Sequence, residues 1–219
     1  EIFQWLLPFF EHNNLSELVM MHCVFGPGCA QKLSLALRAC SNSLTSVKLF
    51  NNHMGGIAFE LHHRGLVGII EALCLHPHIV ELELPETNMG RYECTALGNL
   101  LRGSFTELQK LDLCRTAIDD DGVDSLVGGL AIDTLQKLDL SGNQITARGC
   151  RSLAALLESP RSNLEKMDLI RNNLGDEGAL ILADALAANR KLEHLELYNN
   201  GITAEGWSRF CKVLCDTSS

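Results

Sequence analysis

The chain has 219 residues and a formal net charge of −9, and it is 46% hydrophobic but only 5% aromatic. The acidic balance argues against a nucleic-acid partner, which needs a basic face. No run of 18 or more apolar residues predicts a membrane span. Residues 1–7 are apolar but lack the basic start and the small-residue cleavage site of a signal peptide.

Nine cysteines are scattered along the sequence in an odd number and at irregular spacing. A secreted disulfide framework normally shows an even number, so we expect reduced thiols in an intracellular, cytoplasmic protein. Cys211 and Cys215 are expected to lie on one side of the last helix and to face the core of the domain. No group of residues has the four-ligand pattern of a zinc site, so neither a metal nor another cofactor is expected.

From residue 15 onward one frame recurs seven times, Leu-x-x-Leu-x-Leu-x-x-Asn-x-Leu followed by helical periodicity. The seven copies begin at Leu15, Leu44, Ile79, Leu108, Leu135, Leu164 and Leu192. Successive starts are 27 to 29 residues apart, except for 35 after the second copy. This period accommodates a strand, a loop, a helix of about three turns and a return loop. Residues 1–14 are expected to hold the helix of a preceding partial repeat.

Each frame predicts a short strand, because alternation sends its leucines inward and the residue between them outward. A strand followed each time by a helix predicts parallel strands on one side and helices on the other. Helices are wider than strands, so the stack should curve with the sheet on its concave face. We therefore predict one α/β domain over residues 1–219, a right-handed solenoid shaped as a horseshoe arc.

Two further repeat positions are expected to be structural. The ninth frame position should bond the backbone of neighbouring loops, and it is occupied by Asn52, Asn143, Asn172 and Asn200. A residue without a side chain at each helix start lets helix and strand approach closely, and this position holds Gly122, Gly149, Gly178 and Gly206. The acidic run 119–121 is expected to begin a helix, where negative charge suits the helix dipole.

These residues resemble the leucine-rich repeat family from Leu15 to the end of the chain. The long repeats with a helix and a glycine at its start look like the ribonuclease-inhibitor-like subclass. That subclass includes ribonuclease inhibitors, the sensor portions of nucleotide-binding immune receptors, and activators of Ran-type GTPases. The resemblance implies a binding role without choosing among these partners.

The second repeat is about seven residues too long. The excess lies around residues 55–64, before a helix expected near Val67 to Leu73. One interpretation is a tolerated surface loop. The other is a loop that contacts a partner through Phe59, His62 and His63.

The concave face is expected to carry a row of carboxylates between the strand leucines of repeats three to seven. This acidic row is Glu83, Asp112, Asp139, Asp168 and Glu196. A row two residues earlier contains Lys110, Lys137 and Lys166. The two rows either form a solvated ion-pair ladder that contributes little per pair or leave an acidic strip that attracts a basic partner. Five carboxylates against three lysines should leave the face acidic.

Four residues that follow directly after the strands are candidate anchors for a partner. They are Arg115, Ile170, Arg171 and Tyr198. Aromatic and arginine side chains are typical of the centre of an interface, although single exposed apolar residues are also common on surfaces.

The sequence contains no Gly-rich phosphate loop, nucleophile elbow or His-Glu-x-x-His motif, so no enzyme activity is expected. We predict a non-catalytic protein–protein interaction scaffold that binds its partner on the concave face. Three alternatives remain open: a regulator of a small GTPase, the ligand-sensing part of a nucleotide-binding immune-type receptor, or a structural subunit. Neither end shows the polar cap of a solenoid, so we expect a fragment of a longer protein or ends covered by partners.

Overall fold

The computed structural model describes residues 14–21, 29–40, 43–50, 59–103, 107–130 and 133–216. Strands and helices alternate along the whole of this region. The strands are β1 (Glu17–Met21), β2 (Ser46–Phe50), β3 (Glu81–Glu83), β4 (Lys110–Asp112), β5 (Lys137–Asp139), β6 (Lys166–Asp168) and β7 (His194–Glu196). The helices are α2 (Cys29–Ala39), α3 (Phe59–Leu73), α4 (Arg91–Gly103), α5 (Asp120–Val127), α6 (Ala147–Glu158), α7 (Gly175–Ala188) and α8 (Ala204–Asp216).

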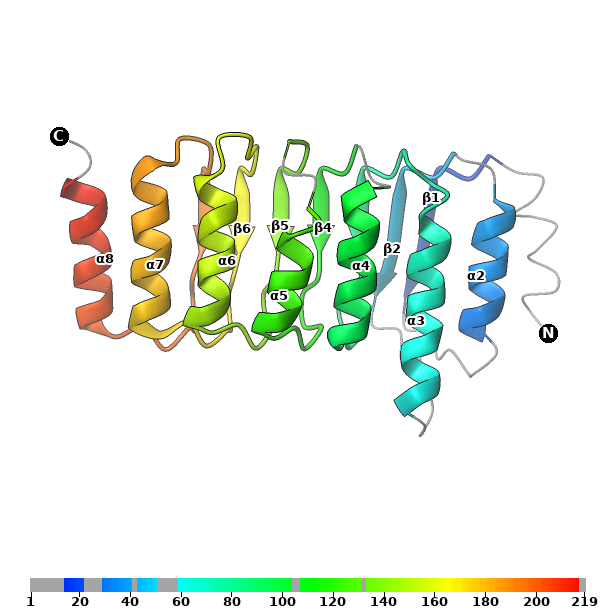
Figure 1. The fold of residues 1–219 in the computed structure, drawn as a ribbon, viewed down its shortest axis with the longest axis horizontal. Coiled ribbons are helices and arrows are strands. Elements are labelled where there is room, and N and C mark those ends of the chain that lie inside the picture. Colours follow the sequence, from blue (N-terminus) through cyan, green and yellow to red (C-terminus); the bar gives the residue numbers. More distant parts are fainter. Residues whose placement is uncertain are drawn as a thin grey trace.

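The seven strands form one parallel sheet in chain order, β1 to β7. Figure 1 shows the helices in a row against one face of this sheet, with the chain advancing steadily from N to C. The predicted solenoid, with strands on the concave face and helices on the convex face, is confirmed. The partial repeat expected over residues 1–14 lies outside the described residues except for residue 14, so it stays a prediction.

The core lies between the sheet and the helices, as the alternation in the frame predicts. Leu111, Leu138 and Met167 occupy the middle of three successive strands, face inward and are at most 3% exposed. Leu153 and Leu182 meet them from the helix layer and are fully buried. Burial of each such side chain contributes about 1.5–3 kcal/mol, so a three-residue strand is held mainly by its leucines.

The asparagine at the ninth frame position ties neighbouring repeats together, as predicted. The Asn172 side-chain N–H group donates to the carbonyls of Leu140 and Leu169 at 2.9 and 3.0 Å, and its oxygen accepts the Ile145 N–H at 3.0 Å. Two other repeats have Asn143 and Asn200 at this position, and the amide group of each donates to two leucine carbonyls. Position 52 lies outside the described residues.

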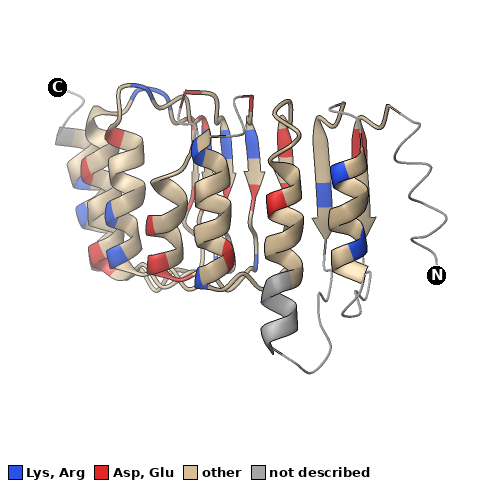
Figure 2. Ribbon diagram, turned by 45° about the vertical axis from the view of Figure 1, so that its right-hand side comes forward, with Lys and Arg blue, Asp and Glu red and all other residues tan. Residues whose placement is uncertain are grey.

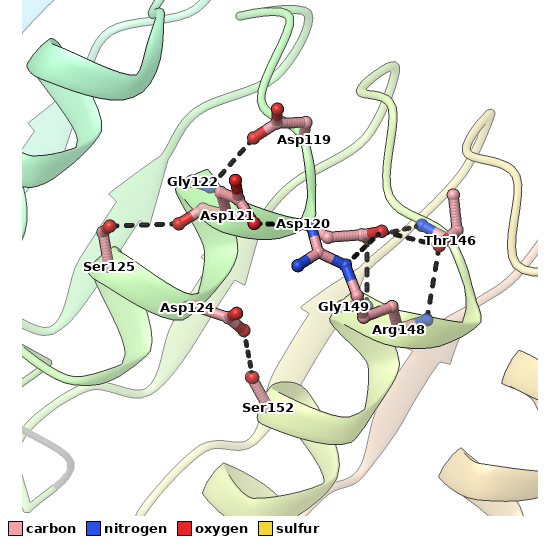
Figure 3. A network of polar contacts seen from close by, with 10 residues as sticks. All are labelled: Asp119, Asp120, Asp121, Gly122, Asp124, Ser125, Thr146, Arg148, Gly149 and Ser152. Atoms are coloured by element: carbon pink, nitrogen blue, oxygen red, sulfur yellow. Dashed lines mark hydrogen bonds and ion pairs between the residues drawn. The ribbon is translucent and has the colours of Figure 1, made fainter.

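The acidic run before α5 begins that helix, as predicted: Asp119 is its N-cap and accepts the Gly122 N–H at 2.9 Å. Asp120 instead reaches the next repeat, where it accepts the N–H groups of Thr146 and Gly149 at 2.8 and 3.0 Å (Figure 3). A Cβ atom at Gly149 would lie 2.5 Å from this carboxylate. Position 149 therefore requires glycine, because the start of α6 lies so close to Asp120 at the start of α5.

Helix α3 differs from its prediction. It begins at Phe59, well before the expected start near Val67, and at 15 residues it extends past its neighbours (Figure 1). Most of the surplus of the second repeat therefore lengthens the helix. Residues 51–58 and the side chains of Phe59, His62 and His63 lie outside the described region, so their contact role stays a prediction.

Candidate functional site

The parallel register aligns the predicted rows across the concave face. Asp112, Asp139 and Asp168 are direct partners in successive strands, and Glu83 and Glu196 continue this acidic row on either side. The row two residues earlier is aligned in the same way, and in β4 to β7 it comprises Lys110, Lys137, Lys166 and His194. Figure 2 shows basic and acidic positions following one another along the strands.

At the N-terminal end of the face the charges are paired. Lys48 on β2 contacts Glu17 at 3.1 Å and Glu81 at 3.3 Å, on the strands to either side. These two hydrogen bonds raise the pKa of the Lys48 ammonium group. In the strands β1 to β3 one lysine is therefore shared by two carboxylates in an ion-pair network.

Glu83 requires a correction. It was expected in an exposed acidic row, but its side chain is only 6% exposed and forms an ion pair with Lys110 on the next strand. A glutamate is long enough to reach diagonally across to the neighbouring lysine, whose stem then covers it. Glu83 is therefore part of the sheet's internal pairing and not a surface available to a partner.

The three aspartates of the acidic row behave differently from Glu83. Each turns one carboxylate oxygen to the backbone two residues ahead. In chain order, these oxygens accept the N–H groups of Cys114, Ser141 and Ile170, at 3.0, 2.8 and 3.0 Å. An aspartate is one methylene shorter than a glutamate, and this turn-forming bond holds it on its own strand. The second oxygen of each aspartate has no partner among the described residues.

As a result, Lys137 and Lys166 have no carboxylate within ion-pairing distance in the described region, and both are exposed. Residues two apart on a strand are separated by about 6.6 Å, so a lysine does not automatically meet the aspartate of its own strand. The ladder interpretation thus holds for Lys110 and is wrong for these two lysines. Sequence reasoning did not include them in the site, although the Glu-to-Asp change along the acidic row was visible.

Two carboxyl groups of the acidic row, those of Asp112 and Asp168, have raised pKa values. Burial raises the pKa of Asp112 to about 6, and the neighbouring charges of Asp139 and Glu83 raise it further. Burial also raises the pKa of Asp168, again with Asp139 and with Glu196 adding to the effect. The carboxylates are therefore close enough to repel one another, so a cation placed over the row would be attracted.

The candidate anchors lie at the carboxyl edge of the strands. Tyr198 is 68% exposed and Ile170 is half-buried. Arg171 is exposed and has no ion-pair partner among the described residues. Arg115 is held in place: its guanidinium contacts Glu86 at 3.2 Å, and its side chain lies against Gly142, where a Cβ would come within 2.6 Å of it. Arg171 is thus the more available of the two arginines.

The remaining polar features of the described region are less specific. No group of three or more His, Cys, Asp or Glu side chains placed to hold a metal ion is found in it. None of its helices is long and apolar enough to cross a membrane. Its eight cysteines are free thiols. The prediction for Cys211 and Cys215 is wrong, because both are exposed while Phe210 supplies the buried stripe of α8.

Comparisons with known proteins agree with this architecture. Residues 133–154, 162–183 and 188–211 match the leucine-rich repeat family model. Ribonuclease inhibitor from Sus scrofa is 31% identical over 187 residues, which cover 84% of this chain and 39% of that protein. NACHT, LRR and PYD domains-containing protein 13 from Homo sapiens is 30% identical over 198 residues, covering 87% of this chain and 19% of that protein. The present chain therefore spans well under half the length of either relative.

Among solved structures, the actin-binding site 2 of leiomodin-1 superposes with a TM-score of 0.52 at 18% identity, covering 74% of this chain and 91% of that one. This likeness supports the fold. The chain belongs to the leucine-rich repeat proteins. More specifically, its repeats are of the ribonuclease-inhibitor-like type.

Proposed function

We propose that this chain is a non-catalytic scaffold that binds a protein partner with a basic surface on its concave face. The observation that carries the proposal is the contrast along the acidic row. Glu83 is neutralised by Lys110, whereas Asp139, Asp168 and Glu196 have no cation within ion-pairing distance among the described residues. These three carboxylates outnumber the two exposed lysines of β5 and β6, Lys137 and Lys166, by one, and a basic partner would compensate them.

The edge of the strands supplies the apolar and hydrogen-bonding part of the same surface. Tyr198 is largely exposed, beside Ile170 and Arg171 of the preceding repeat. Tyrosine and arginine are enriched among the residues that contribute most to binding. Asp112 borders this surface on β4. Arg115 would be a peripheral contact, because its guanidinium is already paired with Glu86.

The acidic face also supports a protein partner over a nucleic acid, whose phosphates it would repel. Free thiols at exposed positions, including Cys74, Cys211 and Cys215, suit a reducing intracellular compartment. We therefore propose that the interaction occurs in the cytoplasm.

The proposal is tested by capturing partners on immobilised chain and comparing variants by quantitative mass spectrometry. The test variant combines Asp168→Asn with Tyr198→Ala. The control is Arg151→Ala on the convex face, which removes only an exposed ion pair with Glu177 at 3.0 Å. We expect a salt-sensitive set of basic proteins that the control retains and the test variant loses. Retention of the same set by both variants would overturn binding at the concave face.

A further inference from the structure

A groove of about 280 Å³ crosses β4, β5 and β6 on the concave face. Its two sides carry opposite charges, and between them lie Leu111 and Leu138, whose side chains face the core. One side is Lys110, Lys137 and Lys166, and the other is Asp112, Asp139 and Asp168. We call this feature the charged groove. Within the described part of the chain, Lys137 and Lys166 have no ion-pair partner, and each aspartate has one carboxylate oxygen without a hydrogen bond. Both sides of the groove can therefore accept further contacts.

From this arrangement we infer that the charged groove receives an α-helix of the partner, lying across the strands, with an acidic stripe facing the lysines and a basic stripe facing the aspartates. This inference rests on the proposed function and specifies the partner's chemistry. A purely basic surface would satisfy the aspartates but would bring like charges against Lys137 and Lys166. A surface with both stripes compensates both rows.

The spacing of the groove favours a helix over an extended segment. Adjacent strands lie about 4.8 Å apart, so the charges of each row recur at about that interval. A helix presents a side chain on one face once per turn of about 5.4 Å. An extended chain presents one on a given face every 6.6 Å or so. Over the two steps from β4 to β6 the mismatch is about 1.2 Å for the helix and about 3.6 Å for the extended chain, and flexible lysines easily absorb the smaller value.

The experiment uses three designed helical peptides of equal length and the complete 219-residue chain. The first peptide carries a Glu stripe and a Lys stripe at helical spacing, on adjacent sides of one face. The second has every Glu of the first replaced by Gln. The third has the composition of the first with its charges scrambled. Affinities are measured by isothermal titration calorimetry at low salt, because screening weakens exposed ion pairs.

Two chain variants remove the charges of one row at a time. Lys137→Gln with Lys166→Gln removes the free lysines. Asp139→Asn with Asp168→Asn removes two carboxylates but keeps the oxygens that accept the Ser141 and Ile170 N–H groups. Thermal unfolding followed by circular dichroism verifies that both variants fold.

We expect the unmodified chain to bind the two-stripe peptide about tenfold more tightly than the scrambled one. The lysine variant should lose that advantage while binding the Gln-substituted peptide at least as well as the unmodified chain does. Equal affinity for the two-stripe and scrambled peptides, or no loss in the lysine variant, would overturn the inference alone. If the aspartate variant binds the Gln-substituted basic peptide as tightly as the unmodified chain does, attraction of a basic partner fails, and the proposed function fails with it.

Discussion

The carboxylate of Asp120 in the fourth repeat accepts both the hydroxyl and the backbone N–H of Thr146 in the fifth, at 2.6 and 2.8 Å (Figure 3). Thr146 is itself the N-cap of α6 and accepts the Arg148 N–H at 3.3 Å. The first turn of one helix is thus completed by a side chain of the repeat before it. The same arrangement recurs two repeats later, where Asp176 accepts the hydroxyl and N–H of Thr203, both at 2.7 Å.

Asp120→Ala should therefore weaken the junction between two repeats. Several hydrogen bonds to a largely buried carboxylate are lost, and the α6 N–H groups at Thr146 and Gly149 lose their acceptor. We expect the free energy of unfolding to fall by about 2–3 kcal/mol at neutral pH, measured by urea denaturation. The adjacent Asp121→Ala is the matched control. It removes only a surface ion pair with Arg148, so it should cost much less than Asp120→Ala.

This effect has a defined pH dependence. Burial alone would raise the pKa of Asp120, but the bonds from Thr146, Gly149 and Arg148 outweigh it and hold the pKa below its usual value. A carboxyl with a depressed folded-state pKa stabilises the fold above its unfolded pKa of about 3.9, and the contribution is lost as pH falls through the folded value. The difference between the unmodified chain and Asp120→Ala should therefore shrink under strongly acidic conditions. A difference that grows with acid would contradict this assignment.

The repeat period predicted the strands, the asparagine bonds and the glycine positions, because each depends on one residue type at a fixed place in the frame. The behaviour of individual charges was less accessible. Glu83 and Asp112 occupy equivalent positions, yet one is paired and buried while the other caps its own turn. One methylene decides which contact forms. The early start of α3 was missed because the surplus residues around 55–64 were assigned to a surface loop and not to a longer helix.

Asn172→Ala should be among the more damaging single changes that leave the surface intact. It leaves the carbonyls of Leu140 and Leu169 and the Ile145 N–H without partners in a region from which water is excluded. We expect a loss of about 3 kcal/mol in the free energy of unfolding. Asn163→Ala serves as the control, because that asparagine is exposed. Similar losses for the two variants in chemical denaturation would contradict the role of the frame asparagine.

Asp112→Asn should stabilise the chain at neutral pH. The raised pKa of Asp112, about 6 through burial, means that its charge opposes folding above that pH. The opposition disappears as pH falls towards the unfolded value of about 3.9. Asparagine keeps the oxygen that accepts the Cys114 N–H and has no charge. We expect a gain on the order of 1 kcal/mol at pH 7 and none near pH 4, as measured by thermal unfolding at both pH values. A loss of stability at pH 7 would show that the charge is compensated.

Arg171 allows binding and folding to be separated at one position. Its φ is +55°, in the left-handed region, and the equivalent residue of the preceding repeat is Gly142 with φ +67°. Arg171→Gly should leave stability unchanged or raise it by up to about 1 kcal/mol, because relief of backbone strain offsets the greater entropy of the unfolded chain. Arg171→Val should lower stability by about 1–2 kcal/mol, because a β-branched residue resists this conformation.

Both variants remove the guanidinium group of Arg171 but keep its backbone N–H, which donates to the Tyr198 carbonyl at 2.9 Å. If Arg171 contacts the partner, both should lose affinity by the same factor, about tenfold, despite opposite effects on stability. Partner capture and thermal unfolding on the same preparations give the two readouts. A loss of binding confined to Arg171→Val would mean that the backbone of this turn, and not the arginine side chain, supports the interface.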